Sequence, residues 1–151
     1  MSIYSIKIGD VVSDLSEFKD QYVLVVNIAD KCGFSPQLHD LERLHQNPDI
    51  ACVVIAFPSN QFNQQSRDDA EMQVWCEQSQ GLSFPVESQI QVNGENAHPL
   101  FQYLKKKAKG ALGQERVTWN YTKFLIYPNE TKIKRFSPQS SIEKVAASIE
   151  T

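Results

Sequence analysis

The residues best suited to do chemistry in this chain are three cysteines, Cys32, Cys52 and Cys76. Cys32 stands between an apolar run at residues 22–29 and the stretch Gly33-Phe34-Ser35-Pro36. The run predicts a buried strand, and the stretch predicts a helix start with Ser35 as the cap and Pro36 in the first turn. A thiol at such a corner lies near unpaired N–H groups and tends toward the reactive thiolate. The spacing alone leaves two interpretations open, a reactive thiol or a cysteine packed at a turn.

The other two cysteines have different settings. Cys52 lies inside a second apolar run, residues 51–57, and we expect it to be inert core. Three cysteines in a chain of 151 residues do not form a disulfide scaffold. In a reducing compartment, any disulfide here should be transient and catalytic.

The elements that must position Cys32 follow from hydrophobic periodicity. The runs at 22–29 and 51–57 are short and rich in β-branched residues, as in a parallel sheet buried on both faces. A helix from Pro36 to about His45 connects them. Further helices are predicted from about Asp68 to Glu77 and from about Pro99 to Lys107.

The last third of the chain predicts a hairpin and a helix. Strand-forming residues at 121–127 and 132–136 flank a turn cluster at 128–131. Ser140-Ser-Ile-Glu143 has the pattern of a capping box that opens a last helix. The order βαβ, α, ββα predicts an α/β fold with a mixed central β-sheet flanked by helices, the thioredoxin arrangement, in a single domain over residues 1–151.

Composition excludes several classes of function. The formal net charge of −3 gives no case for nucleic-acid binding. No apolar stretch approaches the ~20 residues that cross a membrane, and the N-terminus lacks a signal-peptide pattern, so we expect a cytoplasmic protein without stable membrane insertion. His39, His45 and His98 fit no metal-ligand spacing.

Four stretches, in order along nearly the whole chain, carry a resemblance to a known family. They are VLVVNIADKCGFSPQ at 23–37, FPSNQF at 57–62, VNGENAHPL at 92–100 and WNYTKFLI at 119–126, with RFSP at 135–138 in support. The chain resembles the glutathione peroxidases. The resemblance implies that Cys32 is the peroxide-reducing cysteine and that Gln65, Trp119 and Asn120 complete a catalytic tetrad with it.

The chemistry explains these residue types. A thiolate must attack one peroxide oxygen while donors meet the charge that develops on the leaving oxygen. The two amides and the indole N–H are such donors, and none is a charged base. The loop departs from the family pattern, because Asn63, Gln64 and Ser66 replace the usual glycines and glutamate. Gln64 and Gln65 therefore compete for the role, and the loop backbone is in question because glycines there permit positive φ angles.

The resemblance also implies a second cysteine. Cys76 in CEQSQGLSFP lies where thioredoxin-dependent members keep a resolving cysteine. It would form an internal disulfide with the oxidised Cys32, which thioredoxin then reduces. A helix cysteine packed beside Trp75 is the alternative. If the reduced fold holds the two cysteines apart, the 68–80 segment must unwind or shift.

The implied activity is reduction of hydrogen peroxide and of organic or lipid hydroperoxides, with no metal or bound organic cofactor. The short 105–120 segment resembles that of compact members, which are monomers or loose dimers without the tetramerisation insertion. Three alternatives remain: direct reduction by glutathione, a peroxide sensor that relays oxidation to a partner protein, and a catalytically silent binding module.

Overall fold

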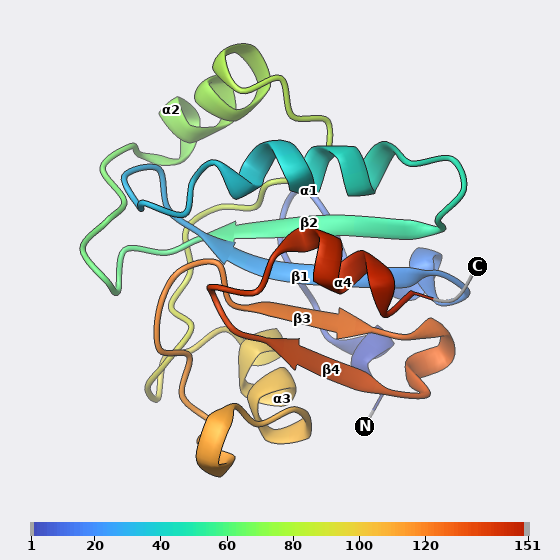
Figure 1. The fold of residues 1–151 in the computed structure, drawn as a ribbon. Coiled ribbons are helices and arrows are strands. Elements are labelled where there is room, and N and C mark those ends of the chain that lie inside the picture. Colours follow the sequence, from blue (N-terminus) through green and yellow to red (C-terminus); the bar gives the residue numbers. More distant parts are fainter. Residues whose placement is uncertain (1, 150–151) are drawn as a thin grey trace.

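A mixed β-sheet forms the centre of the molecule. The computed structural model describes residues 2–149 and, within them, a four-stranded sheet in the order β2-β1-β3-β4 (Figure 1). β1 (Tyr22–Ile28) pairs in parallel with β2 (Cys52–Pro58). β3 (Lys123–Ile126) runs antiparallel to both β1 and β4 (Ile133–Phe136). This arrangement confirms the predicted parallel pair, the hairpin and the mixed sheet.

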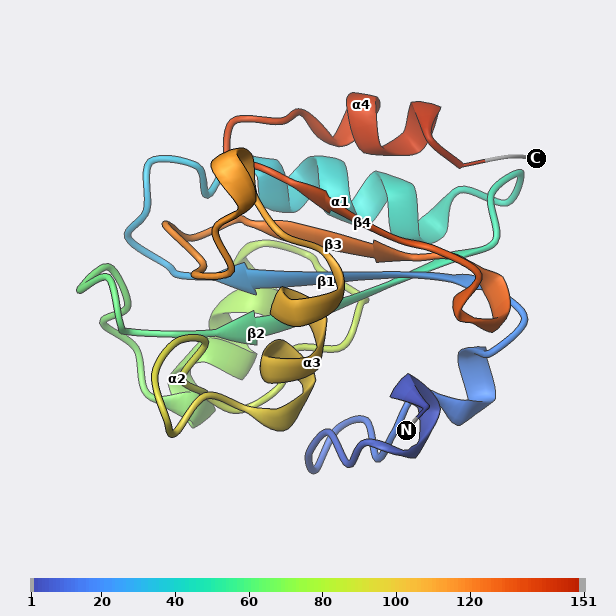
Figure 2. The same ribbon diagram turned by 90° about the horizontal axis from the view of Figure 1, so that it is seen from below.

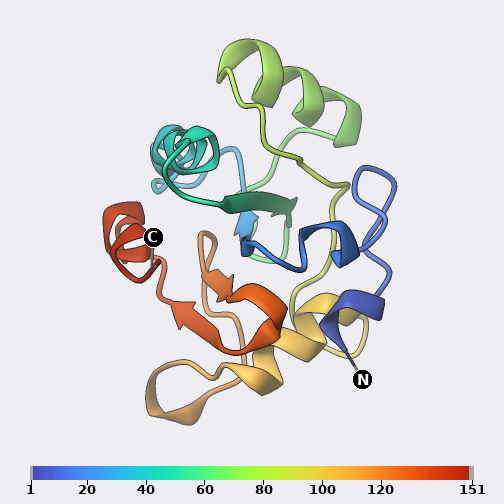
Figure 3. The ribbon, with the colours of Figure 1, turned by 90° about the vertical axis from the view of Figure 1, so that its right-hand side faces the viewer.

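Helices cover both faces of the sheet. α1 (Gln37–Gln46) and α4 (Ile142–Ala147) pack on one face, and α3 (Pro99–Lys107) lies with the N-terminal segment on the other (Figure 2). α2 (Asp69–Val74) lies beyond the edge formed by β2 (Figure 3). It continues into a π-helical stretch, Trp75–Ser79, which we call the π turn. Short 3₁₀ helices occur at Ile3–Ser5, Ser16–Phe18, Ala111–Gly113 and Pro128–Glu130.

Two apolar clusters hold these layers together. Every residue of β1 is buried, because helices cover it on both faces. Leu38, Leu41 and Leu44 of α1 pack in one cluster, and Leu100 and Leu104 of α3 pack in the other. Burial of such side chains is the main stabilising contribution, roughly 1.5–3 kcal/mol each.

The strand directions bring three connections together at one end of the strands. β1 and β2 both finish at this end, where the Ser59 N–H donates to the carbonyl of Ile28 at 3.0 Å. β3 begins there, and the Tyr121 N–H donates to the carbonyl of Asn27 at 2.6 Å. The segments that follow β1, follow β2 and precede β3 therefore meet, and they carry Cys32, Gln65 and residues 119–120.

Residues 85–87 lie along the outer side of β2 and extend the sheet there. Val86 forms an isolated parallel bridge with Ala56. The Ala56 N–H donates to the Pro85 carbonyl at 3.0 Å, and the Glu87 N–H donates to the Ala56 carbonyl at 2.9 Å. Residues 85–87 thus protect part of an otherwise open edge.

Two predicted helix starts are wrong in detail. α1 has Pro36 as its N-cap residue and no side-chain cap, so Ser35 does not cap it. Backbone turns replace the cap: the Ser35 N–H donates to the Cys32 carbonyl and the Leu38 N–H to the Ser35 carbonyl, both at 3.0 Å.

α4 is capped one residue later than predicted. The Ser141 side chain accepts from the Lys144 N–H, so Ser140 is not the cap and Glu143 does not occupy the reciprocal position of a capping box. The carbonyl of Ser140 instead accepts a hydrogen bond from the buried Lys123 ammonium at 2.8 Å. A reciprocal capping box does form at α2, between Asp68 and Glu71.

Candidate active site

Cys32 lies in the connection between β1 and α1, as its sequence position predicts. Its side chain is almost fully buried, with 3 % of the residue exposed. It belongs to the apolar cluster on the α1 side of the sheet, together with Met72, Cys76 and Tyr121. The thiol is free, so it is available for oxidation.

Gln65 is held by both ends of its carboxamide. Its Oε1 accepts from the Asp30 N–H at 2.9 Å, two residues before Cys32. Its Nε2 donates to the Arg67 carbonyl at 3.0 Å and to the Met72 sulfur at 3.2 Å. Gln65 is thereby fixed beside the Cys32 segment, and its two amide protons are directed at these two acceptors.

The loop that carries Gln65 orients its neighbour differently. Gln65 is buried, whereas the side chain of Gln64 donates only to the adjacent Asn63 carbonyl, at 3.4 Å. Asn63 has φ 58°, the left-handed conformation that glycine favours and asparagine tolerates. Asn63 therefore adopts a conformation that a glycine at this position would also allow.

Trp119 and Asn120 lie where β3 approaches β1. Trp119 is 36 % exposed, and its ring packs on Phe62 with 5.3 Å between centroids. Its carbonyl accepts from Asn27 Nδ2 at 3.3 Å. Asn120 is fully buried, and neither its Oδ1 nor its Nδ2 has a hydrogen-bond partner among the described residues. A buried amide without protein partners is energetically costly.

Tyr121 is a site residue that the sequence reasoning missed. It is fully buried and has φ 65°, an unusual value for a bulky residue. Its hydroxyl donates to the Ala29 carbonyl at 3.2 Å. Burial raises the pKa of Tyr121, and the charges of the Cys32 and Cys76 thiolates would raise it further. The hydroxyl therefore stays protonated, in the same buried cluster as the Cys32 and Cys76 thiols. Its position directly after the Trp-Asn pair is the only signal in the sequence.

Cys76 occupies the π turn and is 1 % exposed. Burial raises the pKa of its thiol to about 12, although Arg67 lowers the pKa in part. Cys76 is therefore a neutral, free thiol in this state. Burial also raises the pKa of Cys52 to about 12, in keeping with its predicted place in the core of β2.

Asp30 and Arg67 form a second feature that the sequence reasoning missed. The Asp30 side chain is fully buried and its Oδ2 forms an ion pair with Arg67 Nη1 at 2.8 Å. Burial opposes the charge on Asp30, but hydrogen bonds from Ser66 and Arg67 outweigh it and hold the pKa of the carboxyl below its ordinary value. The two residues lie 37 positions apart and belong to no local pattern.

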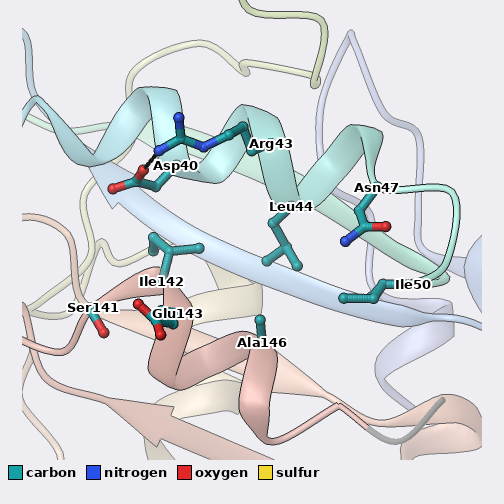
Figure 4. Close-up of a pocket in the computed structure, with 9 residues that line it drawn as sticks. All are labelled: Asp40, Arg43, Leu44, Asn47, Ile50, Ser141, Ile142, Glu143 and Ala146. Carbon is teal, nitrogen blue, oxygen red and sulfur yellow. Dashed lines mark hydrogen bonds and ion pairs between the residues drawn. The ribbon is translucent and has the colours of Figure 1, made fainter.

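The strand ends thus bring together the segments that carry Cys32, Gln65, Trp119 and Asn120, and Cys76 packs in the same buried cluster as Cys32. The groove between α1 and α4, of about 340 Å³, is a separate feature (Figure 4). Leu44, Ile142 and Ala146 line it, and an Asp40–Arg43 ion pair lies at its rim. It contains none of the predicted site residues.

Comparison with known proteins shows the family of this chain. The family model described as "Glutathione peroxidase" matches residues 2–105. A Halalkalibacterium halodurans protein named "Glutathione peroxidase homolog BsaA" is 45 % identical over 138 residues, which is 90 % of this chain and 87 % of the relative. This chain belongs to the glutathione peroxidase family.

Comparison with solved structures shows that this chain has a thioredoxin-like fold. A structure described as "Trgpx in apo form" has 39 % identity and a TM-score of 0.77, over 99 % of this chain and 93 % of that one. A thiol:disulfide interchange protein of the thioredoxin family, from Chlorobium tepidum, is 13 % identical with a TM-score of 0.62, over 97 % and 93 % of the two chains. The second likeness concerns the fold alone. The predicted thioredoxin-like α/β fold is confirmed.

Membership of the glutathione peroxidase family makes this chain an enzyme, a thiol peroxidase that reduces hydroperoxides with a thiol reductant. Within residues 2–149, no cluster of three His, Cys, Asp or Glu side chains is placed to hold a metal ion. No helix in the same range is long and apolar enough to span a bilayer.

Proposed function

We propose that Cys32 is the peroxidatic nucleophile of this enzyme, that Cys76 resolves the oxidised Cys32, and that thioredoxin reduces the resulting disulfide. The observation that carries the proposal is the carboxamide of Asn120. It is fully buried without a described partner, and the residue that follows it, Tyr121, packs in the buried cluster that holds both Cys32 and Cys76. An amide donor in that position supports a role for Asn120 in stabilising the negative charge that develops only while the peroxide is being reduced.

In the first step, the Cys32 thiolate attacks the terminal oxygen of the hydroperoxide. The S–O bond forms as the O–O bond breaks, so sulfur is oxidised to a sulfenic acid and the peroxide is reduced. The leaving alkoxide or hydroxide takes a proton from solvent and departs as alcohol or water. Charge accumulates on the leaving oxygen, so donors aimed at it lower the barrier.

The three proposed donors differ in availability. Asn120 is unengaged, and the ring of Trp119 is partly open to solvent. Gln65 must exchange one of its present acceptors for the reacting atoms. The Met72 thioether is a weak acceptor, so this exchange costs less than loss of the Arg67 carbonyl would. The buried position of Gln65 supports it over Gln64 for this role.

In the second step, the Cys76 thiol must become a thiolate and reach the Cys32 sulfenic sulfur. It is buried and protonated in the structure, so we infer that the π turn and the adjoining part of α2 open first. The π-helical geometry supports this, because such turns are rare and often occur at functional sites. The thiolate then displaces hydroxide and forms the disulfide.

We also infer the setting of this reaction. A resolving cysteine favours thioredoxin over glutathione, because the two thiols of one thioredoxin reduce an internal disulfide in a single encounter, whereas glutathione has one thiol and must react twice. The substrates are hydrogen peroxide and organic or lipid hydroperoxides. The chain acts as a single domain over residues 1–151, in the cytoplasm, as a monomer or loose dimer.

Three cysteine variants test the proposal in assays driven by thioredoxin with its reductase, or by glutathione. We expect Cys32→Ser to abolish peroxide consumption in both and Cys76→Ser to abolish it with thioredoxin. Cys52→Ser, the matched control, should retain it. Thioredoxin-driven turnover that survives in Cys76→Ser would overturn the resolving role. Poor turnover of the wild type with both reductants, despite rapid oxidation of Cys32, would support a relay to another protein.

A further inference from the structure

We propose that Arg67 is a positioning residue that controls how readily Cys76 is delivered to Cys32. The inference rests on the proposed resolving role of Cys76. It concerns one side chain that contacts both the segment before Cys32 and the turn that carries Cys76.

The first contact of Arg67 is with Asp30, two residues before Cys32. The ion pair measures 2.8 Å, and the Asp30 side chain is fully buried while that of Arg67 is 28 % exposed. Asp30 also accepts from the Ser66 N–H and hydroxyl at 2.9 Å and from the Arg67 N–H at 3.1 Å. The carboxylate therefore stays fixed even when the guanidinium leaves.

The second contact is with Trp75. The guanidinium carbon lies 4.6 Å from the centroid of the Trp75 ring, in cation–π geometry. Trp75 is the first residue of the π turn and directly precedes Cys76. The guanidinium of Arg67 thus joins the fixed Asp30 to the residue next to the buried thiol.

The contacts of Arg67 with Asp30 and Trp75, which we call the Arg67 bridge, oppose the movement that resolution requires. Cys76 is 1 % exposed and packs in the apolar cluster, so it must leave that cluster to be deprotonated. The π turn itself is held by the Gln80 N–H on the Trp75 carbonyl at 3.0 Å and the Leu82 N–H on the Cys76 carbonyl at 2.9 Å. Displacing Trp75 breaks the Arg67 contact as well, so the bridge adds to the free energy of local opening.

Arg67 has a second, opposite influence. Its positive charge favours the Cys76 thiolate, but burial has the larger effect on this thiol and keeps it protonated. Opening exposes Cys76 to solvent and so removes the burial that keeps the thiol protonated. We infer that loss of the bridge accelerates resolution.

The step itself does not involve Arg67 chemically. The exposed Cys76 thiol loses its proton to solvent, and the thiolate attacks the sulfenic sulfur of Cys32. The S–S bond forms, the S–O bond breaks, and the hydroxide that leaves takes a proton to become water.

The test measures resolution separately from oxidation. One equivalent of hydrogen peroxide is mixed with the reduced full-length protein, and rapid alkylation with mass spectrometry follows sulfenic acid and Cys32–Cys76 disulfide over time. We expect Arg67→Met to form the disulfide roughly tenfold faster from the sulfenic acid. Amide hydrogen exchange over residues 69–80 should accelerate by a similar factor.

Two further variants make the result specific. Arg67→Lys keeps the charge but loses planar stacking, so we expect an intermediate rate, and it serves as the readout if Arg67→Met does not fold. Arg43→Met removes the exposed Asp40–Arg43 pair on α1 and should leave resolution unchanged.

The outcomes separate the two proposals. A wild type that forms no Cys32–Cys76 disulfide would refute the proposed function and this inference with it. A wild type that forms the disulfide, with unchanged or slower resolution in both Arg67 variants, would overturn the role of Arg67 alone.

Discussion

The side-chain amide of Gln65 donates a hydrogen bond to the sulfur of Met72 at 3.2 Å. The amide thus rests on a weak acceptor inside the apolar cluster that contains Cys32. A donor held by a weak partner turns toward a stronger one when charge appears. The resting structure therefore keeps Gln65 oriented while leaving one of its protons exchangeable.

Gln65→Ala should slow Cys32 oxidation by about 10²-fold, because an amide donor to the leaving oxygen is lost. Met72→Leu conserves volume and removes only the weak acceptor, so oxidation should stay within about threefold of wild type. Stopped-flow oxidation by hydrogen peroxide measures both rates. Equal effects of the two variants would contradict the role of Gln65.

Asn120→Ala should separate activity from stability. No described protein group bonds the Asn120 carboxamide, so its removal should change the free energy of unfolding by only about 1 kcal/mol. Oxidation should fall by about 10²-fold if the amide stabilises the reacting atoms. Urea unfolding and the oxidation rate are measured on the same sample. A large stability loss with little change in rate would indicate a structural residue.

The pH dependence of disulfide formation should reveal the opening of the π turn. Attack from the closed state would accelerate about tenfold per pH unit up to pH 12, since burial raises the pKa of Cys76 to about 12. Attack that is limited by opening should level off near or below about pH 8.5, the ordinary value for a thiol, because the opened thiolate then attacks faster than the turn recloses. We expect the second profile, measured by the alkylation assay between pH 6 and 10.

Asn63 should tolerate glycine and reject a branched residue. Its φ of 58° is open to glycine, so Asn63→Gly should retain both stability and oxidation rate. Asn63→Val should lose about 1–2 kcal/mol in the free energy of unfolding because valine is strained there. It should also oxidise more slowly as Gln65 is displaced. Thermal unfolding with the oxidation assay checks both, and an unaffected valine variant would show that this φ is not required.

Lys123→Met should destabilise the fold. The buried Lys123 ammonium donates to the carbonyls of Ser137, Pro138 and Ser140 at 3.2, 2.9 and 2.8 Å. Burial lowers the pKa of Lys123 to about 8, so it is mostly charged at neutral pH. The substitution removes three charge-assisted hydrogen bonds and leaves the Ser140 carbonyl without the Lys123 donor, while Ser140 N–H and Gln37 Nε2 still donate to the Ser137 and Pro138 carbonyls. We expect a loss of about 3 kcal/mol in urea unfolding. Lys106→Met, an exposed lysine of α3, is the control and should change stability little.

Local sequence was sufficient for most elements. The bounds of α3 are as predicted, and both core strands lie within one residue of their predicted ranges, because apolar periodicity and proline placement are local signals. Ser35 failed as a cap because backbone turns from Cys32 onward satisfy the same donors. The π turn was predicted only as helix, since the two share a local pattern.

The site was less accessible to sequence reasoning. Tyr121 has a positive φ that its residue type disfavours, and tertiary contacts with Asn27 and Ala29 hold it there. The Asp30–Arg67 pair joins segments far apart in the sequence, so only the fold reveals it. The resemblance supplied residue identities, whereas the exchange that Gln65 must make became visible only in its hydrogen bonds.

The β-bridge between Ala56 and Val86 limits how far local unfolding spreads from the π turn toward β2 during turnover. Cys76 lies ten positions before Val86 of this anchor, a tether that extends to about 33 Å when fully stretched. The tether is long enough for Cys76 to travel without pulling residues 85–87 from β2. Under the proposed mechanism, α2 and the π turn therefore open in each catalytic cycle while residues 85–87 continue to cover the edge of β2, which keeps the opened enzyme from pairing with other chains at that edge.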